Sequence, residues 1–83
     1  MLKKLADASP GEKLKIIDVA GGRGVRSRLL QMGLHSGDTI RVLSRGPFGG
    51  PVFIENLSTG SKLAVGRGVA FKIIVESING QNP

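Results

Sequence analysis

GGRGVRSRLLQMGLHSG, residues 21–37, is the stretch that decides the fold. Val25 and Leu29 are four residues apart, which places both side chains on one face of a helix. Gly33 can take a positive φ because it has no Cβ, so we expect the helix to stop there. Leu34 would then fold back onto Leu29, as the apolar residue after a Schellman ending commonly does. The stretch therefore predicts one short amphipathic helix.

The same helix is basic. Arg23 and Arg26 lie three residues apart on a face other than the apolar one, and Arg28 lies between the two surfaces. Leu30 widens the apolar stripe. Four glycines in and around the helix are predicted to be structural turn positions: Gly22, Gly24, Gly33 and Gly37. We therefore expect a basic helix bounded by tight turns.

Short runs of apolar and polar residues flank the helix, and their composition is typical of strands. Five runs are predicted to be strands: residues 13–19, 39–44, 52–57, 62–65 and 71–76. Strands this short, each with one buried face, must close on themselves or pack as two sheets. The predicted fold is mainly β, a small, partly open five-stranded barrel with one short α-helix between the first and second strands. It forms a single domain, residues 1–78, followed by a disordered tail, residues 79–83.

The segment between the second and third predicted strands cannot continue a β-ladder. Pro47 and Pro51 have no backbone donor, and the glycines between them weaken strand pairing. We expect an exposed loop, with Phe48 either at its tip or folded beneath it.

The composition indicates a cytoplasmic protein with an anionic partner. The 83 residues include no cysteine, which excludes disulfides and thiolate metal sites. The apolar runs are too short to span a bilayer, and no apolar segment follows the first lysines as a signal peptide would require. The formal net charge of +6 favours nucleic acid, lipid headgroups or an acidic protein surface as a partner, with an inert basic surface as the alternative.

The residues predict neither a metal site nor an enzyme. A stable Fe²⁺ site usually combines several imidazole and carboxylate ligands, but the chain has one histidine, His35, with Asp38 as its nearest acid. The other carboxylates are scattered singly along the sequence. One histidine on a turn does not support a Ser-His-Asp set, and there is no cysteine nucleophile. We therefore expect no catalytic residue, no cofactor and no stable metal site.

Nucleic-acid binding is an alternative that the charge alone would allow. Twelve lysines and arginines could contact phosphates if enough of them share a face. Small barrels that bind single strands also stack bases on aromatic side chains, and this chain has three Phe and neither Tyr nor Trp. The scarcity of aromatic residues favours protein recognition over nucleic-acid binding.

The glycine turn, the basic helix, the Leu29-Leu30 pair and the stop at residues 32–34 resemble the signature of the FeoA family, the small ferrous iron transport protein A. The resemblance covers about residues 5–76, including the loop at 47–51 and the last predicted strand. Two places depart from the family pattern. Many members carry Asp at the position of Gly50, and a charged run where this chain has Gly66-Arg67-Gly68.

The resemblance implies an SH3-like β-barrel that is a non-enzymatic cytoplasmic accessory protein. Its implied partner is FeoB, the ferrous iron transporter with a cytoplasmic GTPase domain, which would hold it at the inner membrane. The implied effect on FeoB is activation, assembly or modulation of GTP hydrolysis. A second implied function is a regulatory domain like that of iron-dependent repressors. These 83 residues include no helical DNA-binding domain, which favours the first function.

The apolar residues outnumber those that a small core and one short helix require, so some of them should reach the surface. We expect the helix and the loop to dock on the cytoplasmic part of FeoB, with leucines as apolar contacts and arginines steering the encounter. The predicted partner-binding residues are Arg23, Arg26, Arg28, Leu29, Leu30, Pro47, Phe48 and Pro51. An exposed edge of the last strand could also pair two copies into a weak homodimer.

Overall fold

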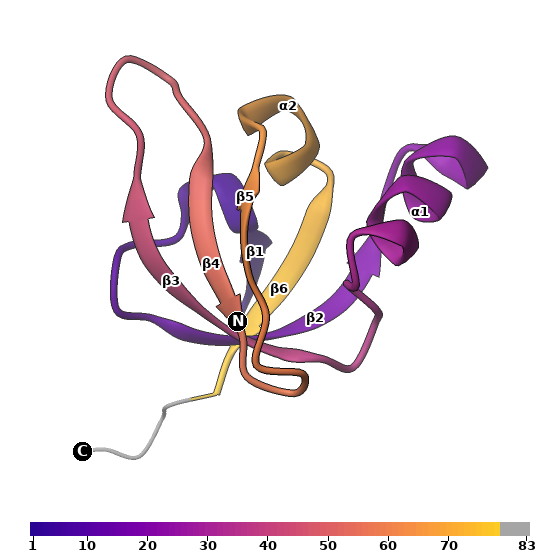
Figure 1. Ribbon diagram of the computed structural model, residues 1–83, viewed down its shortest axis with the longest axis horizontal. Helices are drawn as coiled ribbons and strands as arrows, with labels where there is room; N and C mark the ends of the chain where they lie inside the picture. Colours follow the sequence, from indigo (N-terminus) through magenta and orange to yellow (C-terminus); the bar gives the residue numbers. More distant parts are fainter. Residues whose placement is uncertain (79–83) are drawn as a thin grey trace.

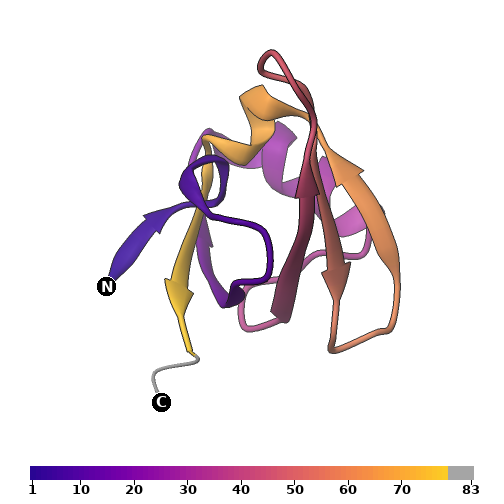
Figure 2. The same cartoon turned by 90° about the vertical axis from the view of Figure 1, so that its left-hand side faces the viewer.

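Six antiparallel strands form one sheet that curls into a partly open barrel (Figures 1 and 2). The computed structural model describes residues 1–78, and the predicted disordered tail, residues 79–83, lies outside the described residues. The elements in chain order are β1 (Leu2–Lys4), the 3₁₀ helix η1 (Leu5–Asp7), β2 (Lys13–Val19), α1 (Gly22–Gln31), β3 (Thr39–Arg45), β4 (Val52–Asn56), β5 (Lys62–Val65), α2 (Arg67–Ala70) and β6 (Ile73–Ser77). The strand order is β1-β6-β2-β3-β4-β5, which leaves β1 and β5 at the edges. This confirms the predicted mainly β barrel with one short helix between early strands.

Strand β1 is a sixth strand, which the sequence does not predict. It pairs with β6, so that Lys3 lies opposite Val75. The ammonium of Lys3 donates to Glu12 with an Nζ–Oε2 distance of 2.6 Å, which ties β1 to the turn before β2. Because β1 covers one edge of β6 and β2 the other, β6 has no free edge. The last strand therefore cannot pair two copies in the way the sequence suggests.

The core lies inside the curled sheet and follows the alternation of the strands. In β2, Leu14 and Ile16 are buried while Lys15 between them is exposed. Helix α1 joins the core through Leu29, and the segment after it through Leu34. The largest buried apolar side chains are Leu5, Leu14, Ile16, Leu29, Ile40, Ile54 and Ile73.

Glycines with positive φ start helix α1 and shape the turn into β3. Gly21 and Gly22 have φ of 101° and 83°, and Gly37 has φ of 96°, values that L side chains rarely adopt. Gly24 behaves differently. It lies inside α1 without a positive φ, so the prediction that it is a turn residue is wrong.

Helix α1 ends in the predicted Schellman motif. Gly33 has φ of 88°, its N–H donates to the carbonyl of Leu30 at 3.0 Å, and the N–H of Leu34 donates to the carbonyl of Leu29 at 2.9 Å. These two hydrogen bonds satisfy carbonyls that have no partner within the helix. The turn that ends α1 also places Leu34 in the core, where Leu29 of the same helix is buried.

Replacing Gly33 by Ala is expected to lower the free energy of unfolding by about 1 kcal/mol, because Ala is strained at a left-handed φ. Nothing lies within 4 Å of a Cβ built at this residue, so the effect would come from the backbone and not from a clash. Gly24→Ala is the matched control, since its φ is not positive and its Cβ would also be unobstructed. Chemical denaturation of both variants checks this. Equal stability of Gly33→Ala and the parent protein would contradict it.

Candidate protein-docking site

The arginines of α1 form an exposed cationic face of the helix. Arg23, Arg26 and Arg28 are all exposed. Arg26 donates to Asp18 at an Nη2–Oδ1 distance of 3.2 Å, which binds the helix surface to the end of β2. Within residues 1–78, Arg23 and Arg28 form no ion pair with a carboxylate. These two guanidinium groups therefore remain available to an anionic partner, whereas Arg26 already has one.

The two leucines of the helix have different environments. Leu29 is 1% exposed and belongs to the core, so the prediction that it contacts a partner is wrong. Leu30 is 52% exposed. The helical spacing predicts which residues share a face, but it does not predict which face packs against the core. The face that carries Leu29 packs against the core. Leu30 alone of this pair can serve as an apolar contact.

The predicted loop is a braced hairpin tip between β3 and β4. The N–H of Gly46 donates to the carbonyl of Pro51 at 2.7 Å, and the N–H of Gly50 donates to the carbonyl of Pro47 at 3.1 Å. A Cβ on Gly46 would lie 3.0 Å from Cδ of Pro51, a tight contact that would push the two arms slightly apart. From α2, Arg67 donates from Nε to the carbonyl of Gly50 at 3.3 Å. The tip is therefore held from within and from a neighbouring element.

Phe48 stands at the end of this tip with its ring fully exposed. Its φ is 56° and that of Gly49 is 75°, the pattern of a type I′ turn, in which Gly, Asn or Asp is usual. A left-handed conformation costs a residue with a Cβ about 1 kcal/mol. The ring has no contact within the described chain that would offset this cost. Of the two predicted positions for Phe48, the tip is the one observed.

The hairpin tip and α1 do not form one contiguous patch. Figure 1 shows the tip and α1 on opposite sides of the barrel, with α2 between them. Pro47 is exposed and Pro51 is half-buried. A single partner surface that contacts both the arginines of α1 and Phe48 must therefore also pass over α2.

Two grooves flank α1. A smaller one, about 190 Å³, lies between α1 and β2 and is lined by the exposed Leu30 together with Val19 and the ion pair of Arg26 and Asp18. A larger one, about 450 Å³, lies between α1 and α2. The smaller groove combines apolar walls with a charged rim, the composition of a small protein-recognition surface.

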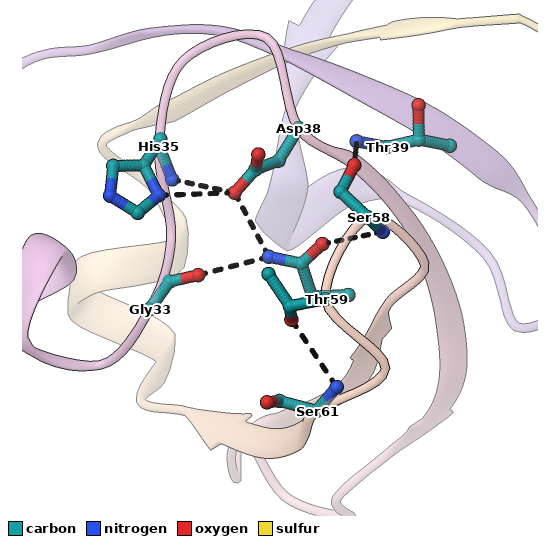
Figure 3. Close-up of polar contacts among 8 residues, drawn as sticks. Gly33, His35, Asp38, Thr39, Ser58, Thr59 and Ser61 are labelled. Atoms are coloured by element: carbon teal, nitrogen blue, oxygen red, sulfur yellow. Dashed lines mark hydrogen bonds and ion pairs between the residues drawn. The ribbon is translucent and has the colours of Figure 1, made fainter.

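The turn after α1 is fastened by a buried amide that the sequence does not reveal. Asn56 in β4 is fully buried, and its Nδ2 donates to the carbonyl of Gly33 and to Oδ2 of Asp38, each at 2.9 Å. Figure 3 labels these two partners, Gly33 and Asp38, and marks both hydrogen bonds with dashed lines. Its Oδ1 accepts the N–H of Ser58 at 2.9 Å. The carboxylate of Asp38 also accepts the N–H of His35 at 2.9 Å. Asn56 thus joins the end of the basic helix to the β4–β5 hairpin.

The pKa of the Asp38 carboxyl is set by this network. Burial alone raises the pKa of Asp38, but hydrogen bonds from Asn56 and from the backbone and ring of His35 outweigh burial, and the net effect is a pKa below the ordinary value. A lowered pKa means that the folded state favours the charged form, so this contribution to stability is present above the unfolded pKa and is lost as pH falls through the folded one.

Asp38→Asn is expected to make the free energy of unfolding depend less on pH in the acidic range. Its side-chain oxygen can still accept from Asn56, but it cannot be protonated in the range where Asp38 titrates. Denaturant unfolding at several values between about pH 6 and pH 2 measures the effect, since the unfolded carboxyl titrates near 3.9. The parent protein should lose more stability over this window than Asp38→Asn does. The pKa of Glu12 is also lowered, because hydrogen bonds from Lys3 and Ser9 outweigh burial. Glu12 is present in both proteins, so its contribution to the pH dependence of stability is the same in each.

Among residues 1–78 there is no group of three or more His, Cys, Asp or Glu side chains placed to hold a metal ion. Nδ1 of His35 lies 3.4 Å from Oδ2 of Asp38, and no third acid of the described residues joins this pair in a group that could hold a metal. In the same part of the chain, no helix has the length and apolarity that crossing a membrane requires.

The curled antiparallel sheet with a short helix between β2 and β3 defines the class of small SH3-like β-barrels. The family model described as FeoA domain matches residues 3–77, which is nearly the whole of the described chain. The chain belongs to the FeoA family.

Known proteins agree with this assignment. A protein of Methanocaldococcus jannaschii, named putative Fe(2+) transport protein A, is 39% identical over 72 residues, which are 87% of this chain and 83% of that one. A crystal structure of the iron uptake regulatory protein FeoA is 33% identical with a TM-score of 0.82, covering 94% of this chain and 99% of that one. A manganese-dependent transcriptional repressor is 19% identical with a TM-score of 0.83, covering 93% of this chain but 42% of its own. At that identity the repressor shares the fold alone.

Proposed function

We propose that this protein is a non-enzymatic, cytoplasmic accessory protein of ferrous iron uptake that binds the membrane transporter FeoB and modulates its assembly, GTPase activity or transport. The observation that carries the proposal is membership of the FeoA family over residues 3–77, together with the relative named for Fe(2+) transport. The proposed partner is the cytoplasmic part of the transporter, which would bring the protein to the inner membrane.

The surface of α1 supports docking as the mode of action. Arg23 and Arg28 are exposed and form no ion pair with a carboxylate of residues 1–78, and Leu30 lies exposed beside the groove between α1 and β2. Exposed arginines around an apolar contact accelerate the encounter with an acidic surface and fix its orientation. In this arrangement the arginines steer and Leu30 provides buried apolar area.

The test is calorimetry with the purified cytoplasmic GTPase domain of the cognate transporter, with single-stranded RNA titrated in parallel at physiological salt. The expected result is micromolar binding to the domain that persists at moderate salt, with no comparable binding to RNA. Binding to RNA alone that disappears as salt rises would instead indicate a nucleic-acid module, since phosphate contacts are strongly salt-dependent.

Phe48→Asn is expected to weaken this binding about tenfold without loss of stability. Aromatic side chains are frequent hot spots at interfaces, and the Phe48 ring is presented on a braced tip that loses little freedom on binding. Asn tolerates the left-handed φ that Phe48 adopts, so the melting temperature should stay constant or rise. Unchanged affinity in a stable Phe48→Asn variant would show that the hairpin tip is not part of the interface.

A further inference from the structure

The groove between α1 and α2 contains two glycines that the fold does not explain. Gly24 lies in α1 and Gly68 in α2, and both line this groove. Neither has a positive φ, and a Cβ built at either would meet nothing within 4 Å. After proline, glycine is the least favourable residue in a helix, so each position weakens the helix that contains it. Within residues 1–78 no contact requires glycine at either position, so a missing side chain would matter to a molecule that approaches from the open side of the groove.

The two exposed glycines line one concave surface from two different helices. The groove has a volume of about 450 Å³, and half-buried Val25 and Val69 supply apolar surface beside the glycines. Figure 1 shows α1 and α2 as two separate helices, and residues of both line the groove. A glycine-lined wall lets a second backbone come closer than any side chain would allow.

The charges of the groove are of one sign. Arg28 lines it from α1, and Lys72 lines it from the segment after α2. Within residues 1–78 neither side chain forms an ion pair with a carboxylate. No acidic residue lines the groove. A ligand that fits this surface therefore carries negative charge next to small apolar groups.

We infer that the groove between α1 and α2 binds an extended, acidic segment of a protein partner, with its backbone against Gly24 and Gly68 and a carboxylate between Arg28 and Lys72. The apolar surface of the two valines favours a peptide over inorganic phosphate, which has no apolar part to bury. The inference rests on the proposed function for the identity of the partner as the transporter, but the chemistry of the groove can be tested without it.

The test uses two blocked model peptides, acetyl-Gly-Val-Asp-Val-Gly-amide and the same peptide with Asn in place of Asp, titrated into ¹⁵N-labelled protein and followed by NMR. The Asp peptide is expected to shift the backbone amides of Gly24 and Gly68 saturably and to bind at least about fivefold more tightly than the Asn peptide, because opposite charges attract across the groove. No saturable shift, equal affinity of the two peptides, or the same shifts with inorganic phosphate alone would overturn the inference.

The decisive variant is G24A/G68A, because two properties should change in opposite directions. Its melting temperature is expected to rise, since Ala favours both helices, while its affinity for the Asp peptide falls about tenfold because two methyl groups block the approach of the backbone. Ser27→Ala, a substitution on an exposed residue of α1 outside the groove, is the matched control and should leave the affinity unchanged. Undiminished affinity in G24A/G68A would overturn the inference.

A second titration separates this inference from the proposed function. If the transporter domain binds the parent protein and G24A/G68A equally, the groove is not the site for a partner segment, while the accessory function stands. If the domain does not bind at all but the Asp peptide binds in the groove, the groove assignment stands and the proposed partner is wrong. If the domain binds the parent protein and loses about tenfold with G24A/G68A, both are supported.

Discussion

R23E/R28E, a double charge reversal on α1, is expected to weaken binding to the transporter domain about 100-fold. Both arginines are exposed, and their reversal breaks no ion pair within residues 1–78. In the complex, the two reversed charges would face the acidic surface that the arginines are proposed to recognise. Calorimetry at physiological salt measures the loss, and circular dichroism checks that the fold is retained.

Arg26 provides the contrast that makes this prediction specific. Its guanidinium is already bonded to Asp18, so Arg26→Ala should reduce the affinity much less than the double reversal does. The exposed ion pair itself contributes little to stability, about 0–1 kcal/mol. If R23E/R28E bound as tightly as the parent protein, the basic face of α1 would not be the docking surface. If Arg26→Ala had the larger effect, Arg26 and not the pair Arg23 and Arg28 would be the main contact on α1.

Asn56→Ala is expected to lower the free energy of unfolding by about 3 kcal/mol, the largest effect of a single polar substitution in this chain. The substitution removes the buried donor for the Gly33 carbonyl and Asp38 and the acceptor for the N–H of Ser58. In a domain of this size such a loss lowers the melting temperature by roughly 12–24 °C.

Thr59→Ala is the matched control for this network. Thr59 is exposed, and its hydroxyl accepts a single long hydrogen bond, 3.3 Å, from the N–H of Ser61 in the same hairpin turn (Figure 3). Its removal should change stability by less than about 0.5 kcal/mol. A similarly small effect for Asn56→Ala would show that the buried amide does not fasten α1 to the β4–β5 hairpin.

The fold is largely predictable because its main signals are local. The alternation in β2 and the helical spacing around Leu29 each identify an element without reference to the rest of the chain. Gly33 specifies the end of the helix through its own φ. Strand β1 is missed because three residues are too few to show a period, and its extended conformation depends on pairing with β6. The extended conformation of β1 is therefore set by pairing with a strand that is distant in sequence and not by its own three residues.

The candidate site is less predictable because it depends on which surfaces the core covers. Periodicity places Leu29 and Leu30 on one stripe, yet the first is buried and the second exposed. Arg26 differs from its neighbours only through Asp18, which comes from another element. Asn56 reads in the sequence as an ordinary residue before a hairpin turn. Its burial and its bond to Gly33, 23 residues away, become evident only when β4 lies beside the end of α1.

The central claim, that this protein assists ferrous iron uptake by docking through α1, is tested most directly by measuring Fe²⁺ uptake in cells that lack its gene. Uptake should fall in these cells, return with the parent protein, and remain low with R23E/R28E expressed at the same level. Uptake that is unaffected by loss of the gene, or fully restored by R23E/R28E, would contradict the account.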